Sequence, residues 1–437
     1  MKKVCVIGLG YIGLPTAALF SKEGIQVTGV DVNQRVVDAL NNGEIIIEEP
    51  DLPDLVKQSV KSGHLKASTI PEEADTFMIA VPTPIYENQT ANINYVEQAV
   101  TAILPYVKKG NVIIVESTIP PRTIADVVAP LFTEAGIDPE SDIHLAHCPE
   151  RVLPGKILTE LIENTRIVGG HTPKAAAAAK EVYRTVVEGD IIETTALTAE
   201  MSKLMENTFR DVNIALANEL VKISDKLGVN AHEVIRLANL HPRVNLHQPG
   251  PGVGGHCLAV DPYFIVEKAV DESRLIQTSR EINNSMPAYV VDKVKSITAG
   301  TRQPKVAVLG LTYKGNVDDV RESPAMDIVH RLKQDDAFDV TVHDPHVKDW
   351  QVPYTLMGLE EALTGADMAL ILTDHNEFKG IEASMWLNHM ATPLVFDTKH
   401  CYFTQNDTVR LIHLGNTGTL VSRDDTTVEQ VNAYERT

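Results

Sequence analysis

The sequence predicts an α/β protein with two Rossmann-like, doubly wound parallel-sheet domains joined by a long central helix and a helical middle region. Three observations predict this class. A strand-turn-helix pattern at residues 3–23 returns at residues 305–315. After both openings, short apolar runs alternate with helical segments, which is typical of a parallel sheet covered by helices on both faces. Between them, residues 198–227 carry one continuous helical pattern.

The length of the chain allows two or three domains, because 437 residues are available at about 150 per domain. We expect a first α/β domain over residues 1–190, a helical middle domain over 191–300 and a second α/β domain over 301–437.

The first domain opens with residues 3–7, a short β-branched run that enters the turn GLGYIG at 8–13. Residues 14–23 then have helical character, and residues 26–30 form a second strand that ends at Asp31. Further strands are predicted at 76–81 and 111–116. The order of these elements is that of a β-α-β unit in a parallel sheet.

The glycine turn predicts a dinucleotide site. Gly8 permits the tight turn, Gly10 lets the backbone approach a pyrophosphate, and Gly13 lets the helix pack on the strand. Asp31 lies 23 residues after Gly8 at a strand end, where its carboxylate can accept hydrogen bonds from ribose hydroxyls and repel a 2′-phosphate. NAD is therefore favoured over NADP. The alternative is a glycine-rich turn with a capping aspartate.

The central helix is expected to begin with Thr198 as its N-cap, to carry Glu200 in its first turn and to stop at Gly228. At 1.5 Å per residue it is about 45 Å long, which suits a connection between domains and a dimer spine. We expect an apolar face made of Met201, Leu204, Met205, Val212, Leu216 and Ile223.

Two features of the middle region suggest covalent chemistry. The glycine-rich stretch PGPGVGGHCLAVD, residues 249–261, ends near Cys257 and lets backbone lie close to a ligand. On the central helix, Lys203 and Asn207 share one face with Glu200 and Arg210, and could offer a charge and an amide donor to an oxyanion. The alternatives are a buried, inert cysteine and a solvated helix face.

The second α/β domain is expected to form strands at 305–309, 340–343, 368–372 and 394–397, with Asp344 ending the second of them. Its turn runs from Gly310 to Gly315, but Thr312 replaces the middle glycine that admits a pyrophosphate. This copy is expected to bind something other than a dinucleotide.

The charge and the cysteines exclude other classes of function. A formal net charge of -20 disfavours nucleic-acid partners and anionic membranes. Four cysteines without CxxC spacing indicate neither a zinc site nor a disulfide framework, so no metal is expected and a reducing cytoplasm fits best. Since no apolar run reaches about 18 residues, we expect no membrane insertion.

Seven motifs stand out along the chain: GLGYIGLP (8–15), VPTP (81–84), EST (116–118), CPERVLPGK (148–156), EMSKLMENTFR (200–210), HPRVNLHQPGPGVGGHCLAVDPYF (241–264) and LTYKGNVDDVRESPA (311–325). Together they resemble the UDP-glucose/GDP-mannose dehydrogenase family across essentially the whole chain. Within that family, the form CLAVDPYF after GVGGH resembles the branch that acts on UDP-N-acetylmannosamine. Pro154 stands where UDP-glucose dehydrogenases carry a second glutamate.

The resemblance implies an NAD-dependent, four-electron oxidation of UDP-N-acetyl-D-mannosamine at C6 to UDP-N-acetyl-D-mannosaminuronic acid, for polysaccharide biosynthesis. The reaction would pass through a thiohemiacetal and a thioester on Cys257. The same reaction on UDP-N-acetylglucosamine or UDP-glucose, a non-catalytic NAD-dependent sensor and a hydroxyacid dehydrogenase are the alternatives. A homodimer is also implied.

The resemblance further implies individual roles. The implied catalytic residues are Cys257, Lys203, Asn207, Asp261, Thr118 and Glu150. The implied cofactor residues are Gly8, Gly10, Tyr11, Ile12, Gly13, Asp31, Thr83, Thr118 and Arg321. The residues implied to contact the UDP-sugar are Glu150, Arg151, Val152, Lys203, Asn207, Arg210, Arg243, Gly250, Tyr313 and Lys314.

Overall fold

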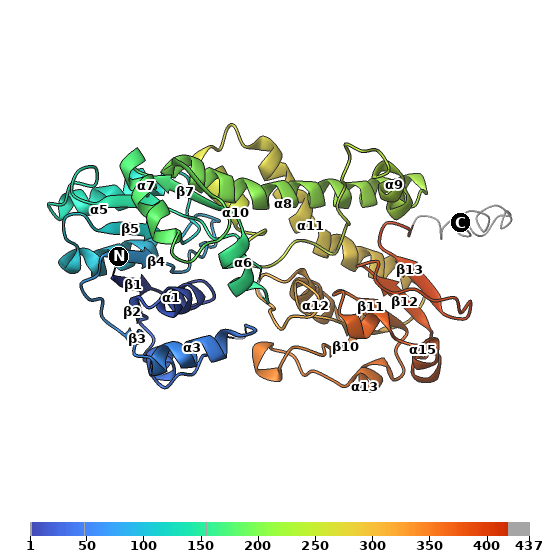
Figure 1. Ribbon diagram of the computed structural model, residues 1–437. Coiled ribbons are helices and arrows are strands. Elements are labelled where there is room, and N and C mark those ends of the chain that lie inside the picture. The colour runs from blue at the N-terminus through green and yellow to red at the C-terminus, as the bar shows by residue number, and fades with distance from the viewer. Residues whose placement is uncertain (1, 48, 154, 418–437) are drawn as a thin grey trace. The chain divides into compact units, whose positions relative to one another are not determined.

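The structure is a computed structural model that describes residues 2–47, 49–153 and 155–417 (Figure 1). The chain divides into two compact units. The first unit comprises Met1–Glu206 and Tyr263–Glu272, and the second comprises Asn207–Pro262 and Ser273–Thr437. Each unit contains a largely parallel sheet between helices, so the predicted α/β class is confirmed.

The sheet of the first unit has the strand order β3-β2-β1-β4-β5-β6-β7-β8. Its first six strands follow the dinucleotide-binding order 3-2-1-4-5-6, with the switch point between β1 and β4. All neighbours are parallel except β6 and β7, which are antiparallel. The strands are β1 (Lys3–Ile7), β2 (Gln26–Val30), β3 (Leu65–Ser68), β4 (Thr76–Ile79), β5 (Val112–Val115), β6 (His144–His147), β7 (Arg166–Gly170) and β8 (Ile191–Thr195).

Helices cover both faces of this sheet because alternate strand residues point to opposite sides. Val4 and Val6 of β1 pack with α1, α2, α3 and α7, whereas Cys5 and Ile7 pack with α4 and α5. The elements are α1 (Gly13–Lys22), α2 (Gln34–Asn41), α3 (Leu52–Lys61), α4 (Asn94–Ile103), η1 (Leu104–Tyr106), η2 (Ile124–Val128), α5 (Ala129–Glu134), α6 (Ile157–Glu163), α7 (Pro173–Tyr183) and α10 (Asp261–Lys268).

The central helix α8 runs over Ala196–Leu227, two residues longer at its start than expected. The hydroxyl of Thr195 accepts a hydrogen bond from the Thr198 amide at 3.2 Å, so Thr195 caps the helix and the expectation of Thr198 as N-cap is wrong. Glu200 therefore lies beyond the first turn. Its carboxylate accepts from the amides of Arg122 and Ile124 at 2.6 and 2.9 Å.

The expected apolar face of α8 is only partly buried. Leu204 is fully buried, but Met205, Leu216 and Ile223 are 45%, 52% and 47% exposed. The helix packs into the second unit through Val221 instead. A stripe of apolar side chains on α8 is therefore left without cover from the described residues of this chain.

The sheet of the second unit is parallel throughout, with the order β10-β9-β11-β12-β13. One face packs on α11, α12, Val221 of α8 and Ala231 of α9. The other face packs on α13 and on α15, which contributes the buried Trp386. The elements are α9 (Ala231–Ala238), α11 (Arg274–Ile297), β9 (Lys305–Leu309), α12 (Pro324–Gln334), β10 (Asp339–His343), η3 (Asp349–Gln351), α13 (Leu359–Leu363), β11 (Met368–Ile371), α14 (Asn376–Lys379), α15 (Ala383–His389), β12 (Leu394–Asp397) and β13 (Arg410–His413).

Among the described residues, no helix combines the length and the apolar character that crossing a bilayer requires.

Candidate active site

The glycine turn after β1 has the geometry that a dinucleotide requires. Gly8 has φ +93°, and a Cβ there would lie 2.5 Å from the Ala80 carbonyl oxygen. A Cβ at Gly13 would lie 1.9 Å from the carbonyl oxygen of Gly8, whereas a Cβ at Gly10 would meet no protein atom within 4 Å. Gly8 and Gly13 are thus required by the protein itself, and Gly10 keeps the space above the turn open.

Asp31 follows β2 and is oriented by backbone. Its Oδ2 accepts from the Leu9 amide at 3.0 Å and its Oδ1 accepts from the Asn33 amide at 2.9 Å. Since a carboxylate oxygen has two lone pairs, both oxygens can accept a further hydrogen bond from a ribose. Of the two turn residues implied to touch the cofactor, Tyr11 is exposed and Ile12 is half-buried. These residues fit NAD.

Thr83 and Thr118 lie after the neighbouring strands β4 and β5, on the same edge of the sheet as Gly8. The Thr83 hydroxyl donates to the Thr118 carbonyl at 2.5 Å, which ties the two loops together. Because ligands of open α/β sheets bind at the carboxyl ends of the strands, both threonines stand at the edge that a cofactor would occupy.

Glu150 lies in the loop after β6 and is buried. Its Oε1 accepts from the Arg151 amide at 2.5 Å, and its Oε2 lies 2.8 Å from Nη1 of Arg166. The Arg151 guanidinium is paired with Glu206 at 2.7 Å and also donates to the Thr165 carbonyl at 3.1 Å. Arg151 is therefore committed to protein contacts and would have to exchange one of them to reach a substrate.

The same loop continues through Val152, which packs against the cluster of Leu19, Ile157 and Leu161. Pro154 lies outside the described residues. Glu49 holds the end of the loop by accepting from the amides of Gly155 and Ile157 at 2.8 and 2.7 Å.

A hydrogen-bonded chain joins the polar face of α8 to the cysteine loop. The side-chain amide of Asn207 donates to Asp261 at 2.5 Å, and its oxygen accepts from Arg210 at 2.5 Å. The Asp261 amide in turn donates to the Cys257 carbonyl at 2.8 Å. The structure thus brings together residues that the sequence spacing could not place. Lys203 is half-buried one helical turn before Asn207.

Cys257 is half-buried, and its loop packs on Tyr313. A Cβ at Gly254 would lie 2.4 Å from the Glu322 carbonyl oxygen, and one at Gly255 would lie 2.8 Å from the Tyr313 ring. The glycines are therefore needed for close packing. Burial raises the pKa of the Tyr313 hydroxyl, Asp319 and Cys257 raise it further, and Arg321 opposes them.

A buried amide network fixes the start of the cysteine loop. The Gly250 amide donates to Asn218 of α8 at 2.9 Å, and Asn218 donates to Asn283 of α11 at 2.9 Å. Asn283 donates to Asp211, which forms a buried ion pair with Arg280 at 2.6 Å. The loop is thus held by two long helices, as a preorganised site requires.

The second glycine turn is closed to a dinucleotide. Gly310 has the same φ of +93° as Gly8, but the carboxylate of the aspartate after β10 is fully hydrogen-bonded within the protein. Asp344 is buried, and each of its oxygens has two partners: Oδ2 accepts from the Leu311 amide at 2.7 Å and pairs with His375 at 3.1 Å, and Oδ1 accepts from the amides of His346 and Val347 at 2.9 and 3.0 Å. No oxygen of this carboxylate is left for a ribose.

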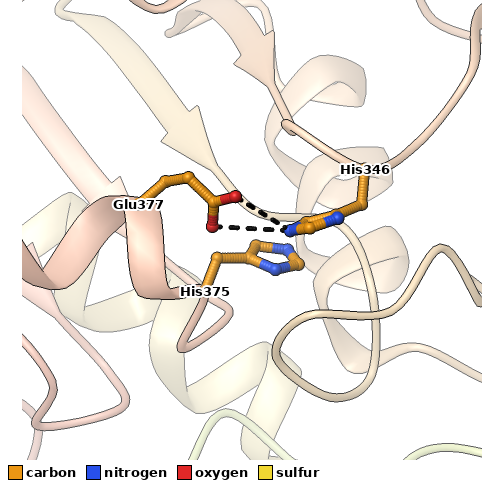
Figure 2. Close-up of side chains that lie close together, drawn as sticks. All are labelled: His346, His375 and Glu377. Carbon is orange, nitrogen blue, oxygen red and sulfur yellow. Dashed lines mark hydrogen bonds and ion pairs between the residues drawn. The ribbon is translucent and has the colours of Figure 1, made fainter. Parts of the chain in front are cut away.

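Three side chains beside this turn could suggest a metal, although none was expected. Figure 2 shows His346, His375 and Glu377 close together, with Glu377 bonded to His346 at 3.2 Å. However, Nδ1 of His375 accepts from the Asn316 amide at 2.9 Å, so its Nε2 carries the proton given to Asp344. With both ring nitrogens committed, His375 holds the turn and does not offer a metal a lone pair.

The remaining implied residues are basic and lie in the second unit. Arg243 and Lys314 are exposed, and Arg321 pairs with Asp319 at 2.7 Å. Sequence reasoning missed Lys399, which follows β12 and whose Nζ would lie 3.8 Å from a Cβ at Gly250. A lysine two residues after Asp397 at a strand end was the signal available for it.

Family models match most of the chain. The NAD binding domain of the UDP-glucose/GDP-mannose dehydrogenase family matches residues 2–187, its central domain matches 197–285, and its UDP binding domain matches 307–404. NAD is thus the cofactor of the first domain, and a UDP-sugar is the ligand class of the last.

Individual proteins match with similar coverage. A UDP-N-acetyl-D-mannosamine dehydrogenase of Methanococcus maripaludis is 49% identical over 92% of this chain and 93% of its own. An NDP-N-acetyl-D-galactosaminuronic acid dehydrogenase of Ralstonia nicotianae is 47% identical over 91% and 96%. The structure of the UDP-N-acetyl-mannosamine dehydrogenase of Staphylococcus aureus superposes with a TM-score of 0.87 at 53% identity, over 96% and 100% of the two chains. The chain belongs to the UDP-glucose/GDP-mannose dehydrogenase family, whose members are NAD-dependent nucleotide-sugar dehydrogenases.

Proposed function

We propose that the chain oxidises UDP-N-acetyl-D-mannosamine at C6 to UDP-N-acetyl-D-mannosaminuronic acid. Relatives named UDP-N-acetyl-D-mannosamine dehydrogenase support this substrate, since they are 47–49% identical over at least 86% of the chain. Relatives named for NDP-N-acetyl-D-galactosaminuronic acid are 47% identical, so the substrate panel includes UDP-N-acetylgalactosamine. UDP-N-acetylglucosamine and UDP-glucose remain the alternatives from the sequence.

The observation that carries the mechanism is the chain Arg210–Asn207–Asp261 with Cys257 one turn away. NAD, when bound, accepts one hydride in each of two oxidations, so two molecules are used in turn. The Cys257 sulfur adds to the aldehyde carbon formed by the first oxidation, which gives a thiohemiacetal. The second oxidation leaves a thioester, and water then cleaves the carbon-sulfur bond, restoring the thiol and releasing the carboxylate.

The residues around the sulfur have separate roles in this proposal. Asn207 uses one N–H for Asp261 and keeps a second, which with the Lys203 ammonium would stabilise the oxyanions. Asp261 and Thr118 would hold and activate the hydrolytic water. Glu150 would lie at the reacting carbon.

For the cofactor, we propose that the turn formed by Gly8, Gly10, Tyr11, Ile12 and Gly13 receives the pyrophosphate at the start of α1. Asp31 would receive the ribose, and Thr83, Thr118 and Arg321 would complete the site. The open space above Gly10 supports this assignment.

For the UDP-sugar, we propose contacts from Arg210, Arg243, Gly250, Tyr313 and Lys314 of the second unit. We add Lys399, because it is a cation at the carboxyl end of a strand beside Gly250. The resemblance adds Glu150, Arg151, Val152 and Lys203 to the proposed sugar contacts.

We also propose a cytoplasmic homodimer with the three domains 1–190, 191–300 and 301–437. The four cysteines are free, which suits a reducing compartment. The dimer is supported by Phe209, Leu216 and Ile223, which are exposed on α8 at seven-residue spacing.

The substrate is tested by initial rates of NADH formation on UDP-N-acetylmannosamine, UDP-N-acetylglucosamine, UDP-N-acetylgalactosamine and UDP-glucose. We expect kcat/KM for the first to exceed the others by about 100-fold or more, since discrimination rests on polar contacts to the sugar. A higher value for any other sugar would replace the substrate and leave the chemistry in place.

A further inference from the structure

A buried group of charges lies directly behind Glu150 in the first unit. Nη1 of Arg166 is 2.8 Å from Oε2 of Glu150 and 3.8 Å from Oε1 of Glu116. The Arg166 guanidinium also lies 4.6 Å above the ring of Tyr183. The Tyr183 hydroxyl donates to Glu116 at 2.6 Å. These contacts join Glu150 to a second carboxylate through one arginine.

The sheet topology produces this group. Glu116 follows β5, and Glu150 lies in the loop after β6, so both carboxylates stand at the carboxyl edge. Because β7 runs antiparallel to β6, its first residue, Arg166, reaches the same edge; a parallel strand would begin at the opposite edge. The pairing of His147 with Gly169, continued by three residues along each strand, places Glu150 opposite Arg166.

The charges in this group do not balance. Two carboxylates share one guanidinium, and one oxygen of Glu116 has no hydrogen-bond partner. Glu116 and Arg166 are only 2% and 6% exposed, so an excess negative charge there is costly. Burial, opposed by Arg166 and reinforced by Glu150, raises the pKa of Glu116 to about 7.

We propose that Arg166 is a positioning residue for Glu150, and that Glu116 controls how much of the Arg166 charge is left for Glu150. When Glu116 is protonated, Arg166 binds Glu150 alone. When Glu116 ionises, the two carboxylates compete for one guanidinium and Glu150 is held less firmly. The groups that face Glu116 are Arg166 of β7, Tyr183 of α7, Cys148 after β6 and Glu150 itself.

This inference rests on the proposed function, since it assumes that Glu150 lies at the reacting sugar. The kinetic test compares the pH profiles of kcat/KM for the wild type and Glu116→Gln, with Glu193→Gln as a surface control that loses only the exposed pair with Lys180. We expect kcat/KM of Glu116→Gln to be close to that of the wild type below pH 6. Above pH 8 it should exceed the wild-type value several-fold, up to about tenfold. Superimposed profiles would overturn the proposal.

Variants of the arginine separate positioning from folding. Arg166→Lys keeps a cation and Arg166→Met removes it, so the lysine variant should recover part of the kcat/KM that the methionine variant loses. If Arg166→Lys and Arg166→Met had the same melting temperature and the same kcat/KM, the role of Arg166 would be purely structural. Tyr183→Phe removes a hydrogen bond that favours the ionised Glu116, so its pH inflection should move upward.

Melting temperatures give a readout that does not depend on the reaction. Because the pKa of Glu116 is raised on folding from 4.5 to about 7, its contribution to stability is full below 4.5 and is lost as pH rises through 7. Glu116→Gln should therefore gain in melting temperature relative to the wild type between pH 5 and 8. If the difference in melting temperature between Glu116→Gln and the wild type did not change with pH, the inference about Glu116 would be overturned. If none of the four UDP-sugars were oxidised, only the proposed function would be affected.

Discussion

Asn207 is the residue at which the α8 helix and the cysteine loop meet. Its side-chain oxygen and nitrogen are fixed in opposite directions by Arg210 and Asp261, so the amide cannot rotate without losing a hydrogen bond. A donor held in one orientation costs no reorganisation during the reaction. The remaining N–H is therefore held in one orientation, as the proposed role of oxyanion donor requires.

Replacing Asn207 by alanine should lower kcat by about 10²–10³-fold, because one preorganised oxyanion donor is lost. Steady-state kinetics with NADH absorbance measure the effect. Asn213→Ala, on the same helix but bonded to the Asn245 carbonyl, is the matched control and should retain kcat. Equal losses in the two variants would remove Asn207 from the site.

Two glycines of the cofactor turn, Gly10 and Gly13, should respond differently to replacement by alanine. Gly10→Ala leaves the fold intact, since its Cβ meets no protein atom, but should raise the KM for NAD at least tenfold by filling the pyrophosphate space. Gly13→Ala places a Cβ 1.9 Å from the Gly8 carbonyl oxygen and should lower the melting temperature as well. Thermal unfolding with and without NAD separates the two effects; an unaltered KM in Gly10→Ala would contradict the assignment.

Single residues could be predicted where the constraint is local. The Gly8 turn and Asp31 follow from spacing within one β-α-β unit. Arg166 and Glu116 could not be found, because 50 residues separate them and only an antiparallel β7 brings them together. The sequence does not separate Thr198 from Thr195 as the N-cap, because two threonines three residues apart offer the same local signal.

At the scale of elements, α8 and α11 are held together by a buried polar core. Arg280 and Asp211 form an ion pair at 2.6 Å, and Asn283 bonds both to Asp211 and to Asn218. Since Asn218 also receives the Gly250 amide, the helix pair and the cysteine loop form one network. Packing of these helices therefore sets the geometry of the loop.

Arg280→Met should lower the free energy of unfolding by about 3–5 kcal/mol, because it leaves the Asp211 carboxylate buried without its partner. Urea unfolding measures this loss. Arg184→Met breaks only an exposed pair with Glu181 and should change stability by less than about 0.5 kcal/mol. A similar small change in both variants would refute the importance of the buried network.

Acid should weaken the second unit through a histidine cluster. His400 stacks on His232 of α9 with ring centroids 3.8 Å apart and lies 4.5 Å from His413 of β13. Burial first, then the neighbouring histidines, lowers the pKa of His400 to about 4. The stabilising contribution is thus present above pH 6.5 and lost as pH falls towards 4.

His400→Asn should therefore reduce the fall in melting temperature between pH 7 and 4.5. His64→Asn, which changes a half-buried histidine of the first unit that lies outside this cluster, should leave that fall unchanged. Identical pH dependence in His400→Asn and the wild type would show that the cluster does not titrate on unfolding.

Strands with strong patterns were predicted to within a few residues, and β1, β2, β9 and β12 were predicted with their observed bounds. The missed strands are short or polar. β8 is half-exposed or exposed along its whole length, and β6 begins and ends with histidine, so neither shows an apolar run. Their place in the sheet comes from pairing with neighbours, which no local pattern records.

At the scale of the whole molecule, the exposed stripe on α8 predicts self-association. Light scattering at micromolar concentration should give twice the 47.9 kDa chain mass. Leu216→Glu should shift this towards the monomer, because it places a charge in an apolar contact. Trp350→Glu, which alters another exposed apolar residue in η3, should not. A monomer in the wild type would contradict the dimer.

If one cysteine carries a four-electron oxidation, each sugar must yield two NADH, so the stoichiometry of NADH is the most direct test of this mechanism. Limiting UDP-N-acetylmannosamine is oxidised to completion by the wild type and by Cys257→Ser, and NADH is measured by absorbance. We expect about two NADH per sugar for the wild type and near-total loss of turnover in Cys257→Ser. One NADH per sugar, or full activity of Cys257→Ser, would contradict it.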